Sequence, residues 1–408
     1  MSLKRDRLLT YFLVVLCAFT IIRSALYIDA QYRWSPIDEF AHMDYVDKVS
    51  EGTLPKVSDT ISDELFQSVI KDTLRSFLHN IHSRQALGLG NFSYESHHPP
   101  IYYFVLAVPE RIMKKWHWDI IKRLKVLRLC SYFIFVAGML LCIPLFRSLN
   151  KLGFSIPLSY AWGCVLFGLA IITNRRYGLG NNMMSPLMIN SCAYFLILYY
   201  GKSSQRNLYL MITFCCLSVF TAFSNIFIVP LLFLLLLKKY RFNFSWKSFC
   251  ISLLIIITSV LLLFYWRKVT APNPLIAYFI YTAFEGIVPA GQLKYGVFWQ
   301  FLSEDMLTLT FIKDKLNVTY LMLALFVMSN GICLIYLKTV FKKNAWLICF
   351  GLLFFTFIIC TFLLNKYVGA VYWIAFRHYL GFIPVIYVSC TAFIPVLYSK
   401  YFRKEQQE

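Results

Sequence analysis

Runs of about twenty apolar residues recur along this chain, and each is long enough for a helix to cross a lipid bilayer. Hydrophobic residues make up 59% of the 408 residues and the mean hydropathy is +0.61, so a soluble core could not bury the apolar surface. The sequence therefore predicts an all-α polytopic membrane protein with about 9–11 transmembrane segments. The candidate segments are 8–28, 98–113, 126–147, 154–173, 183–200, 207–222, 223–237, 247–266, 317–337, 344–364 and 378–399.

The positive charge of the chain follows the ends of these segments. The net charge of +20, from 40 Lys and Arg against 20 Asp and Glu, would suggest nucleic acid in a soluble protein. Here the cations cluster at segment ends, which is typical of membrane topology and of contact with the lipid bilayer, so we expect no nucleic-acid partner. Lys4, Arg5 and Arg7 precede the first segment and predict a retained anchor with a cytoplasmic N-terminus.

This charge pattern predicts five parts of the chain. They are a first transmembrane anchor (1–28), a first outer loop (29–97), a transmembrane core (98–266), a second outer loop (267–316) and C-terminal transmembrane segments (317–408). In a bacterium this is a multi-pass inner-membrane protein whose outer loops face the periplasm.

One part of the topology stays open. A basic cluster after segment 98–113 has a cytoplasmic character, yet five segments then separate it from the next cytoplasmic cluster, and five is an odd number. Either one segment is re-entrant, or 207–237 is one helix, or 98–113 does not cross and the cluster lies outside. The cluster consists of Lys114, Lys115, Lys122, Arg123 and Lys125.

The first outer loop contains an amphipathic pattern. Apolar residues recur at helical spacing from Phe66 to Ile81, and Ser62 is a suitable N-cap before Asp63. We expect a helix here, either in the outer membrane interface or packed on the membrane domain.

Two polar segments flank this loop. In the first, Asp38 and Glu39 are adjacent carboxylates at a bilayer surface, where partial burial would suit a proton acceptor, and His42 lies one helical turn later. The same residues could merely start a helix. In the second, His98, Tyr102 and Tyr103 surround Pro99-Pro100 at the start of segment 98–113. The adjacent His97 and His98 cannot easily direct both side chains at one metal ion. The sequence therefore does not support a divalent metal, and we expect no cofactor.

Two further segments carry cations. Arg175 and Arg176 precede Asn181 and Asn182 between two apolar segments, where a charged connector is the simpler interpretation. Arg377 and His378 stand at the outer end of the last segment, where an Arg could grip a phosphate or only anchor the topology. The apolar segments themselves hold almost no ionisable residues, which favours chemistry at the membrane surface over ion-coupled transport.

With these segments in order, the chain resembles the GT-C fold glycosyltransferases, which use a polyprenyl-phosphate-linked sugar at the outer face of a membrane. Asp38-Glu39 with His42 resembles the acidic motif of their first outer loop, and His98-Pro99-Pro100-Ile101-Tyr102-Tyr103 resembles their His-Pro-Pro-Leu-Tyr-Tyr motif. Arg377-His378-Tyr379 is similar to the Gly-Arg-Tyr motif of some members. Within this family it resembles the O-antigen-modifying, serotype-converting glucosyltransferases. Where many relatives have Asn-Asp, it has Asn181-Asn182.

The resemblance implies an inverting transfer from an undecaprenyl-phosphate-linked sugar to a surface polysaccharide or lipid-linked oligosaccharide. Asp38 would be the base and Glu39 its partner, or a group that positions the acceptor. The cationic candidates for the donor phosphate are Arg377, His378, Arg175 and Arg176, and the candidates for substrate contact are His42, His98, Tyr102, Tyr103, Asn181 and Asn182. The alternatives are a lipid A aminosugar transferase, a protein mannosyltransferase and a lipid-linked sugar flippase.

Overall fold

The computed structural model describes residues 2–30, 34, 39–73, 92–152, 156–174, 178–222, 225, 228, 246–270, 328–329, 331–332, 335, 381 and 383–391. Apart from one isolated antiparallel bridge between Thr60 and Phe92, the regular structure of this part is helical. In chain order the helices are α1 (Ser2–Ala30), α2 (Glu39–Ser50), α3 (Asp63–Thr73), η2 (Tyr94–His97), α4 (Ile101–Lys115), α5 (Ile120–Leu140), α6 (Cys142–Lys151), α7 (Leu158–Asn174), η3 (Asn181–Met184), α8 (Ser185–Gly201), α9 (Gln205–Val219), α11 (Trp246–Thr270) and α17 (Ile383–Thr391).

Four helical stretches among the described residues are long and apolar enough to cross a membrane. They are Asp6–Ile28, Ile120–Lys151, Asn181–Gly201 and Leu253–Thr270, and Leu158–Ile172 is a shorter apolar helix. Predicted segments 8–28, 126–147, 183–200 and 247–266 coincide with the four, which makes the chain an α-helical membrane protein. Nearly all of 223–245 and 271–382, and thus the second outer loop and most C-terminal segments, lie outside the described residues.

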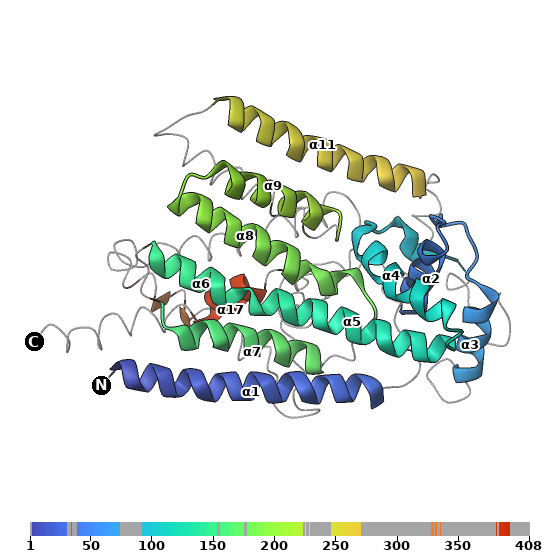
Figure 1. Ribbon diagram of the computed structural model, residues 1–408, viewed down its shortest axis with the longest axis horizontal. Coiled ribbons are helices and arrows are strands. Elements are labelled where there is room, and N and C mark those ends of the chain that lie inside the picture. Colours follow the sequence, from blue (N-terminus) through green and yellow to red (C-terminus); the bar gives the residue numbers. More distant parts are fainter. Residues whose placement is uncertain are drawn as a thin grey trace, which may run out of the picture.

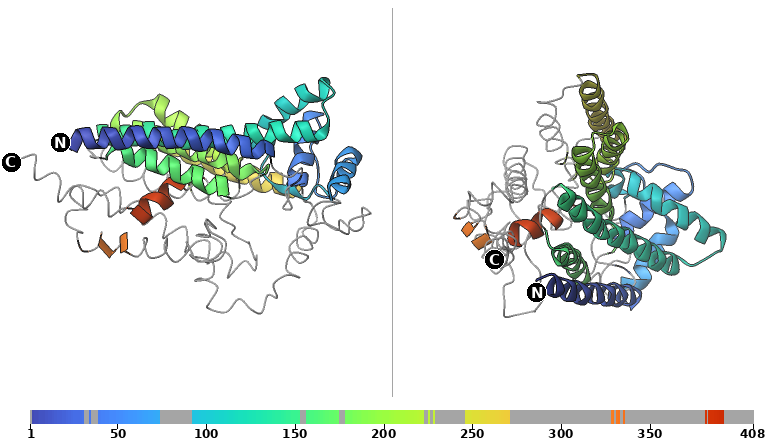
Figure 2. Two further views of the ribbon diagram at one scale, coloured as in Figure 1. Left: turned by 90° about the horizontal axis from the view of Figure 1, so that it is seen from below. Right: turned by 60° about the vertical axis from the view of Figure 1, so that its left-hand side comes forward.

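The helices form a bundle with a distinct end. Helices α1, α5, α7, α8, α9 and α11 run along the length of the molecule, while α2, α3 and α4 gather at the end remote from the N-terminus (Figure 1). We call this the polar end. The two further views confirm that α1 and α7 lie side by side and that α8 lies against α9 (Figure 2). The arrangement brings the ends of several long helices to one place.

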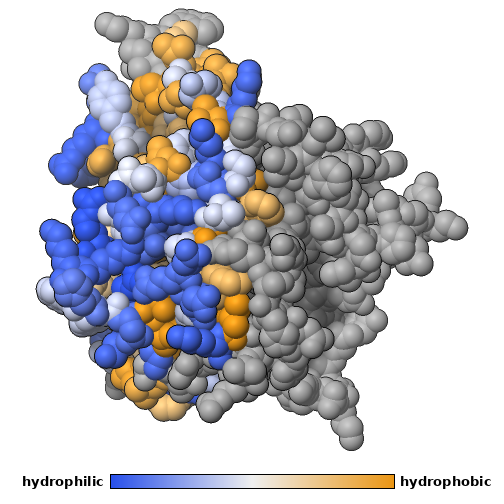
Figure 3. Space-filling view, turned by 90° about the vertical axis from the view of Figure 1, so that its right-hand side faces the viewer, coloured by the Kyte–Doolittle hydropathy of each residue, from blue (hydrophilic) through white to orange (hydrophobic). Residues whose placement is uncertain are grey.

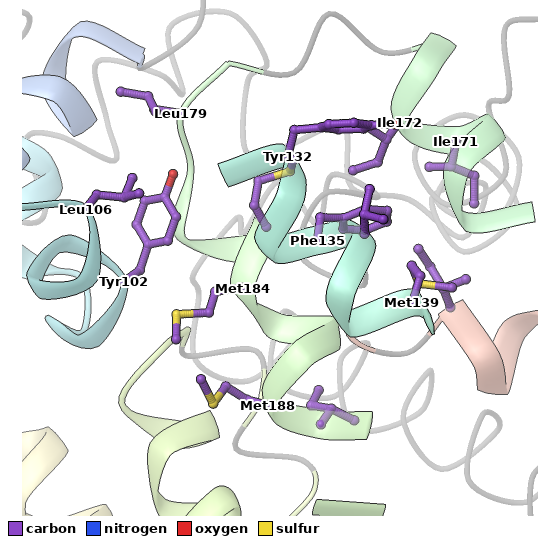
Figure 4. Packing of buried hydrophobic residues seen from close by; sticks show 14 of the residues in the cluster. Tyr102, Leu106, Tyr132, Phe135, Met139, Ile171, Ile172, Leu179, Met184 and Met188 are labelled. Atoms are coloured by element: carbon purple, nitrogen blue, oxygen red, sulfur yellow. The ribbon is translucent and has the colours of Figure 1, made fainter. Parts of the chain in front are cut away.

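Helices α5 and α8 approach closely at the centre of the bundle. A Cβ on Gly138 would lie 2.3 Å from the Leu187 backbone nitrogen, so only glycine fits at this contact. Asn190 Nδ2 donates to the Gly138 carbonyl at 2.8 Å and adds a polar link in an apolar environment. Phe135 and Met139 of α5 are fully buried beside this contact, among side chains of α7 and α8 (Figure 4). The contact therefore fixes how both helices reach the polar end.

Helix α3 packs on the bundle and does not present its apolar face to lipid. The predicted cap is confirmed, because Ser62 Oγ accepts from the Leu65 backbone N–H at 3.4 Å. Leu65 and Val69 are each 1% exposed, and α3 contacts α2 and α5. Of the two interpretations of this segment, the structure has the packed helix, while the predicted part beyond Thr73 lies outside the described residues.

Helix α4 does not run from one end of the bundle to the other, because both of its termini lie at the polar end. Lys114 Nζ, at its C-terminus, lies 2.6 Å from Asp47 Oδ1 and 2.6 Å from Glu51 Oε1, and both carboxylates belong to the predicted first outer loop. Arg123, at the start of α5, binds Glu64 of α3, because its Nη2 donates to Glu64 Oε1 at 2.7 Å and to Oε2 at 2.6 Å. The basic cluster therefore lies on the same side as residues 39–64. With these residues outside, as predicted, 98–113 does not cross, and the odd number of five segments correctly leads from the outer side to the next cytoplasmic cluster.

Arg123 is the centre of a buried ionic cluster, which we call the Arg123 cluster: Arg123, Asp47, Glu64 and Glu110. The guanidinium is 2% exposed and contacts Asp47 Oδ1 at 3.2 Å, the Glu64 carboxylate and Glu110 Oε1. Three carboxylates thus share one guanidinium, with Lys114 beside Asp47. Burial raises the pKa of the Glu110 carboxyl to about 7; Arg123 lowers that pKa and Asp47 raises it.

This shift predicts a pH-dependent stability. The folded protein keeps Glu110 protonated to a higher pH than the unfolded chain does, for which the pKa is about 4.3. The contribution of this proton to stability is complete below that value and is lost as the pH rises through about 7. We expect the thermal unfolding midpoint of the detergent-purified protein to fall between about pH 5 and about pH 8. The unfolding midpoint of Glu110→Gln should fall less over this range, because the glutamine side chain stays neutral.

Glu51→Gln is the matched control, because Glu51 belongs to the same region but its side chain is 59% exposed. It should keep the pH dependence of the parent protein. A Glu110→Gln variant with the same pH dependence as the parent would assign the effect to another group.

Candidate functional site

Glu39, the first residue of α2, is fixed in a buried ion pair with α5. Arg128 Nε and Nη2 donate to the two Glu39 oxygens at 2.7 and 2.5 Å. Glu39 is fully buried and Arg128 is 2% exposed. A bidentate pair of this kind has a defined geometry, and removal of either partner would leave a buried charge uncompensated. The pair therefore sets where the chain enters α2.

The segment between α7 and η3 closes over the same carboxylate. The Leu179 backbone N–H donates to Glu39 Oε1 at 2.9 Å. A Cβ on Gly178 would lie 2.2 Å from that oxygen, so a larger residue would displace the carboxylate or the backbone. Two segments 140 residues apart in the sequence thus meet at one charged group.

Tyr102 of α4 joins this segment to α5. Its hydroxyl accepts from the Gly180 backbone N–H at 3.0 Å and lies 2.6 Å from Ser131 Oγ. Burial raises the pKa of Tyr102 well above its usual value, so the hydroxyl is a neutral hydrogen-bonding group. Figure 4 shows Tyr102 and Leu106 on α4 facing α5 and the segment that bears Leu179. Tyr102 holds three elements together.

A second group of polar side chains lies beside Glu39 on α2. His42 Nδ1 is 2.8 Å from the Tyr103 hydroxyl and 3.6 Å from Glu95 Oε2. His98 Nε2 is 2.8 Å from the same Glu95 oxygen. We call these four residues the histidine cluster: His42, Glu95, His98 and Tyr103. One buried carboxylate lies between two imidazoles, an arrangement that can exchange protons.

Hydrogen bonds from α2 and α11 fix the backbone that carries Glu95 and His98. Asp44 accepts from Ser93 Oγ, and Lys48 Nζ donates to Ser93 Oγ at 2.5 Å. The His98 carbonyl accepts from Tyr45 Oη at 3.4 Å and from Trp266 Nε1 of α11 at 3.2 Å. The histidine cluster is therefore held from two sides, and one of them is a helix far along the chain.

Asn181 and Asn182 of η3 are buried at 2% and 8% exposure. Asn181 Nδ2 donates to the Thr221 carbonyl at 3.1 Å, which ties η3 to the end of α9. This contact gives Asn181 a structural role, and the substrate contact expected of both amides stays a prediction.

The structure brings together described residues of three predicted segments, and the fourth segment lies outside the described residues. Glu39 and His42, His98 with Tyr102 and Tyr103, and Asn181 with Asn182 all lie at the polar end. Asp38, Arg175, Arg176, Arg377 and His378 lie outside the described residues.

Two participants were missed from the sequence. Arg128 stands at the third position of predicted segment 126–147, and a charge inside an apolar run is itself a signal, because it needs a partner. Glu95 stands three residues before His98, but its place between His42 and His98 follows only from the fold.

Within the part that the structure describes, no three or more His, Cys, Asp or Glu side chains gather so that they could hold a metal ion. The chemistry that these residues offer is proton exchange and hydrogen bonding beside a fixed cation. Comparison of the chain with protein-family models, with curated proteins and with solved structures gave no match.

The pairing of Glu39 with Arg128 can be measured in a double-mutant cycle. Glu39→Gln and Arg128→Met should each destabilise the protein by about 3–5 kcal/mol, because each leaves a buried charge unpaired. The double variant should cost less than the sum of the two. Lys122→Met is the control on the same helix, since its side chain is 71% exposed, and should change stability by less than about 0.5 kcal/mol.

Unfolding in mixed detergent micelles measures the stability of the parent protein, the two single variants, the double variant and the Lys122→Met control. Additive effects of the two single substitutions would show that the pair does not hold α2 to α5.

Proposed function

We propose that this protein is a glycosyltransferase of GT-C-like architecture. It transfers a sugar, glucose in our proposal, from an undecaprenyl-phosphate donor to a surface polysaccharide such as O-antigen, on the periplasmic face of the inner membrane. The observation that carries the proposal is that three segments of an otherwise apolar bundle meet at the polar end. They are the segments that contain Glu39, His98 and Gly180. The first two of these segments carry the resemblance, and the third contains Asn181-Asn182, where many relatives have Asn-Asp.

The contacts of Glu39 divide the two adjacent carboxylates by role. Both Glu39 oxygens are bound by Arg128, and one also accepts from Leu179. Glu39 is therefore a positioning residue, which anchors the start of α2. Asp38 directly precedes it in the sequence and is the general base of the proposal.

The proposed reaction is a single displacement. An acceptor hydroxyl oxygen attacks the anomeric carbon while the bond from that carbon to the phosphate oxygen breaks. The hydroxyl proton goes to Asp38, and polyprenyl phosphate leaves with the electron pair of the broken bond. Cations must stabilise the phosphate as its charge increases. The proposal assigns no metal and no cofactor to this step.

The cationic residues proposed to bind the donor phosphate stand close in the sequence to residues whose contacts the structure describes. Arg175 and Arg176 stand between Asn174, the end of α7, and Gly178, which lies against Glu39. Arg377 stands four residues before Gly381, whose Cβ would lie 3.1 Å from Ser185 Cβ at the start of α8. The proposal assigns the donor phosphate to these arginines and to His378, and the sugars to the histidine cluster, Tyr102, Asn181 and Asn182.

Removal of the proposed base is the first test. Asp38→Asn should lower transfer by about 10²–10⁴-fold at unchanged membrane abundance, because the amide cannot accept the proton. The measurement is the mass of the cell-surface polysaccharide with and without the protein. Asp63→Asn, at an exposed carboxylate of α3, is the control and should transfer normally.

Full transfer by Asp38→Asn would refute the base assignment. If the parent protein moves the donor unchanged across reconstituted vesicles and never consumes it, the protein is a flippase.

The phosphate assignment has a separate kinetic test. Arg377→Ala should raise the KM for the lipid donor more than it changes the KM for the acceptor, since the guanidinium contacts only the donor in the proposal. Arg403→Ala, beyond the last apolar segment, is the control and should leave both constants unchanged. Unchanged donor kinetics in Arg377→Ala would remove Arg377 from the phosphate site.

A further inference from the structure

Helix α4 is apolar on two opposite faces, and in the part of the chain that the structure describes only the inner face is covered. On the inner face Tyr102, Tyr103 and Leu106 are at most 1% exposed and pack on α2 and α5. On the outer face apolar side chains recur every four residues and remain exposed. They are Phe104 (42%), Val108 (62%), Ile112 (44%) and Trp116 (63%), which we call the outer stripe.

The outer stripe lies where the bundle leaves the apolar layer. Tyr132 Oη donates to the Ile21 carbonyl, two turns before the apolar span of α1 ends at Ile28. Tyr102 contacts Ser131, the residue before Tyr132, and Glu110 contacts Arg123, eight residues nearer the start of α5. Helix α4 therefore runs antiparallel to the first turns of α5, from the last turns of the α1 span outward. Its 15 residues are too few to cross a bilayer.

The end of α4 carries two exposed tryptophans in a fixed turn. Trp118 N–H donates to the Met113 carbonyl at 3.2 Å and His117 N–H to the Lys114 carbonyl at 3.0 Å, with His117 at a φ of 54°. This is a Schellman-type helix end, which is stiff because both carbonyls are bound. The Trp116 and Trp118 ring centroids are 5.7 Å apart, and both rings reach the surface. Tryptophan favours the membrane–water interface, where its ring is half apolar.

Charge around this turn is mainly basic. Lys115 is exposed, and the Lys122 side chain is 71% exposed. The acidic neighbour is Asp119, whose Oδ1 accepts from Ile121 and Lys122 backbone N–H groups and caps α5, with Oδ2 3.7 Å from Lys122 Nζ. Lys114 is bound by Asp47 and Glu51. Seen end-on, hydrophobic patches lie among the hydrophilic side chains of the polar end (Figure 3).

We propose that the outer stripe and the turn after it, residues 115–122, bind the headgroup layer of an anionic bilayer leaflet. The aliphatic and aromatic side chains of α4 face acyl chains at the boundary, Trp116 and Trp118 lie among the headgroups, and Lys115 and Lys122 bind lipid phosphates. The bilayer is the occupant that this combination fits, because an apolar stripe at the level of the span ends continues into tryptophans and lysines. Helix α3 has no such exposed stripe, because its apolar residues are buried apart from the half-buried Ile70.

Photo-crosslinking identifies the occupant directly. A benzophenone side chain is placed at Val108 or Ile112 of the full chain, in vesicles of phosphatidylethanolamine and phosphatidylglycerol. Lipid adducts on α4 peptides, seen by mass spectrometry, are the expected result. The control position is Lys71, exposed on α3, which should give no lipid adduct.

Three results would overturn the proposal. A crosslinked dimer would assign the stripe to a second copy of this chain, and a crosslink to another protein would assign it to that partner. Equal adducts from Val108, Ile112 and Lys71 would show no specific contact.

Lysine removal tests the charge part independently of the stripe. Lys115→Gln with Lys122→Gln should weaken the preference for phosphatidylglycerol over phosphatidylcholine among the bound lipids by roughly fivefold per lysine. Lys71→Gln is the matched control and should leave the preference unchanged. An unchanged preference in the double variant would refute the assignment of these lysines to lipid phosphates.

Discussion

Two guanidinium groups buried on one helix organise the polar end. Arg123 and Arg128 of α5 are each 2% exposed, and a buried cation is tolerated only with anionic partners. They are five positions apart, so they point about 140° away from each other around the helix. Arg128 holds the start of α2 through Glu39, while Arg123 holds α2, α3 and α4 through Asp47, Glu64 and Glu110. The polar end is thus assembled around α5.

The apolar runs were the most informative part of the sequence. They located the four long helices, and the Ser62 cap located the start of α3, because both signals are local and depend on few residues. The described residues of the Glu39, His98 and Asn181 motifs lie at one end, and their roles remain predictions. Length and hydropathy thus predicted the class of fold.

Sequence periodicity could not predict whether lipid or another helix covers the apolar face of a helix. Segment 98–113 has the hydropathy of a span because α4 is apolar on both faces, yet its fully buried Glu110 requires a guanidinium that only the fold supplies. The pattern from Phe66 onward predicted a helix but not whether lipid or protein would cover it. In the same way Arg128 is positioned by Glu39, which lies 89 residues earlier in the sequence. Glu95 is positioned by His42 and His98. Such choices depend on long-range contacts.

The indole of Trp266 has a consequence for how the protein is made. Its Nε1 donates to the carbonyl of His98, a residue 168 positions earlier, so the backbone of the histidine cluster gains this bond only after α11 has been synthesised. The ribosome completes α2 to α5 first, and these helices can pair while the remainder is still emerging. The nascent chain consequently holds the histidine cluster without this bond until α11 has been inserted.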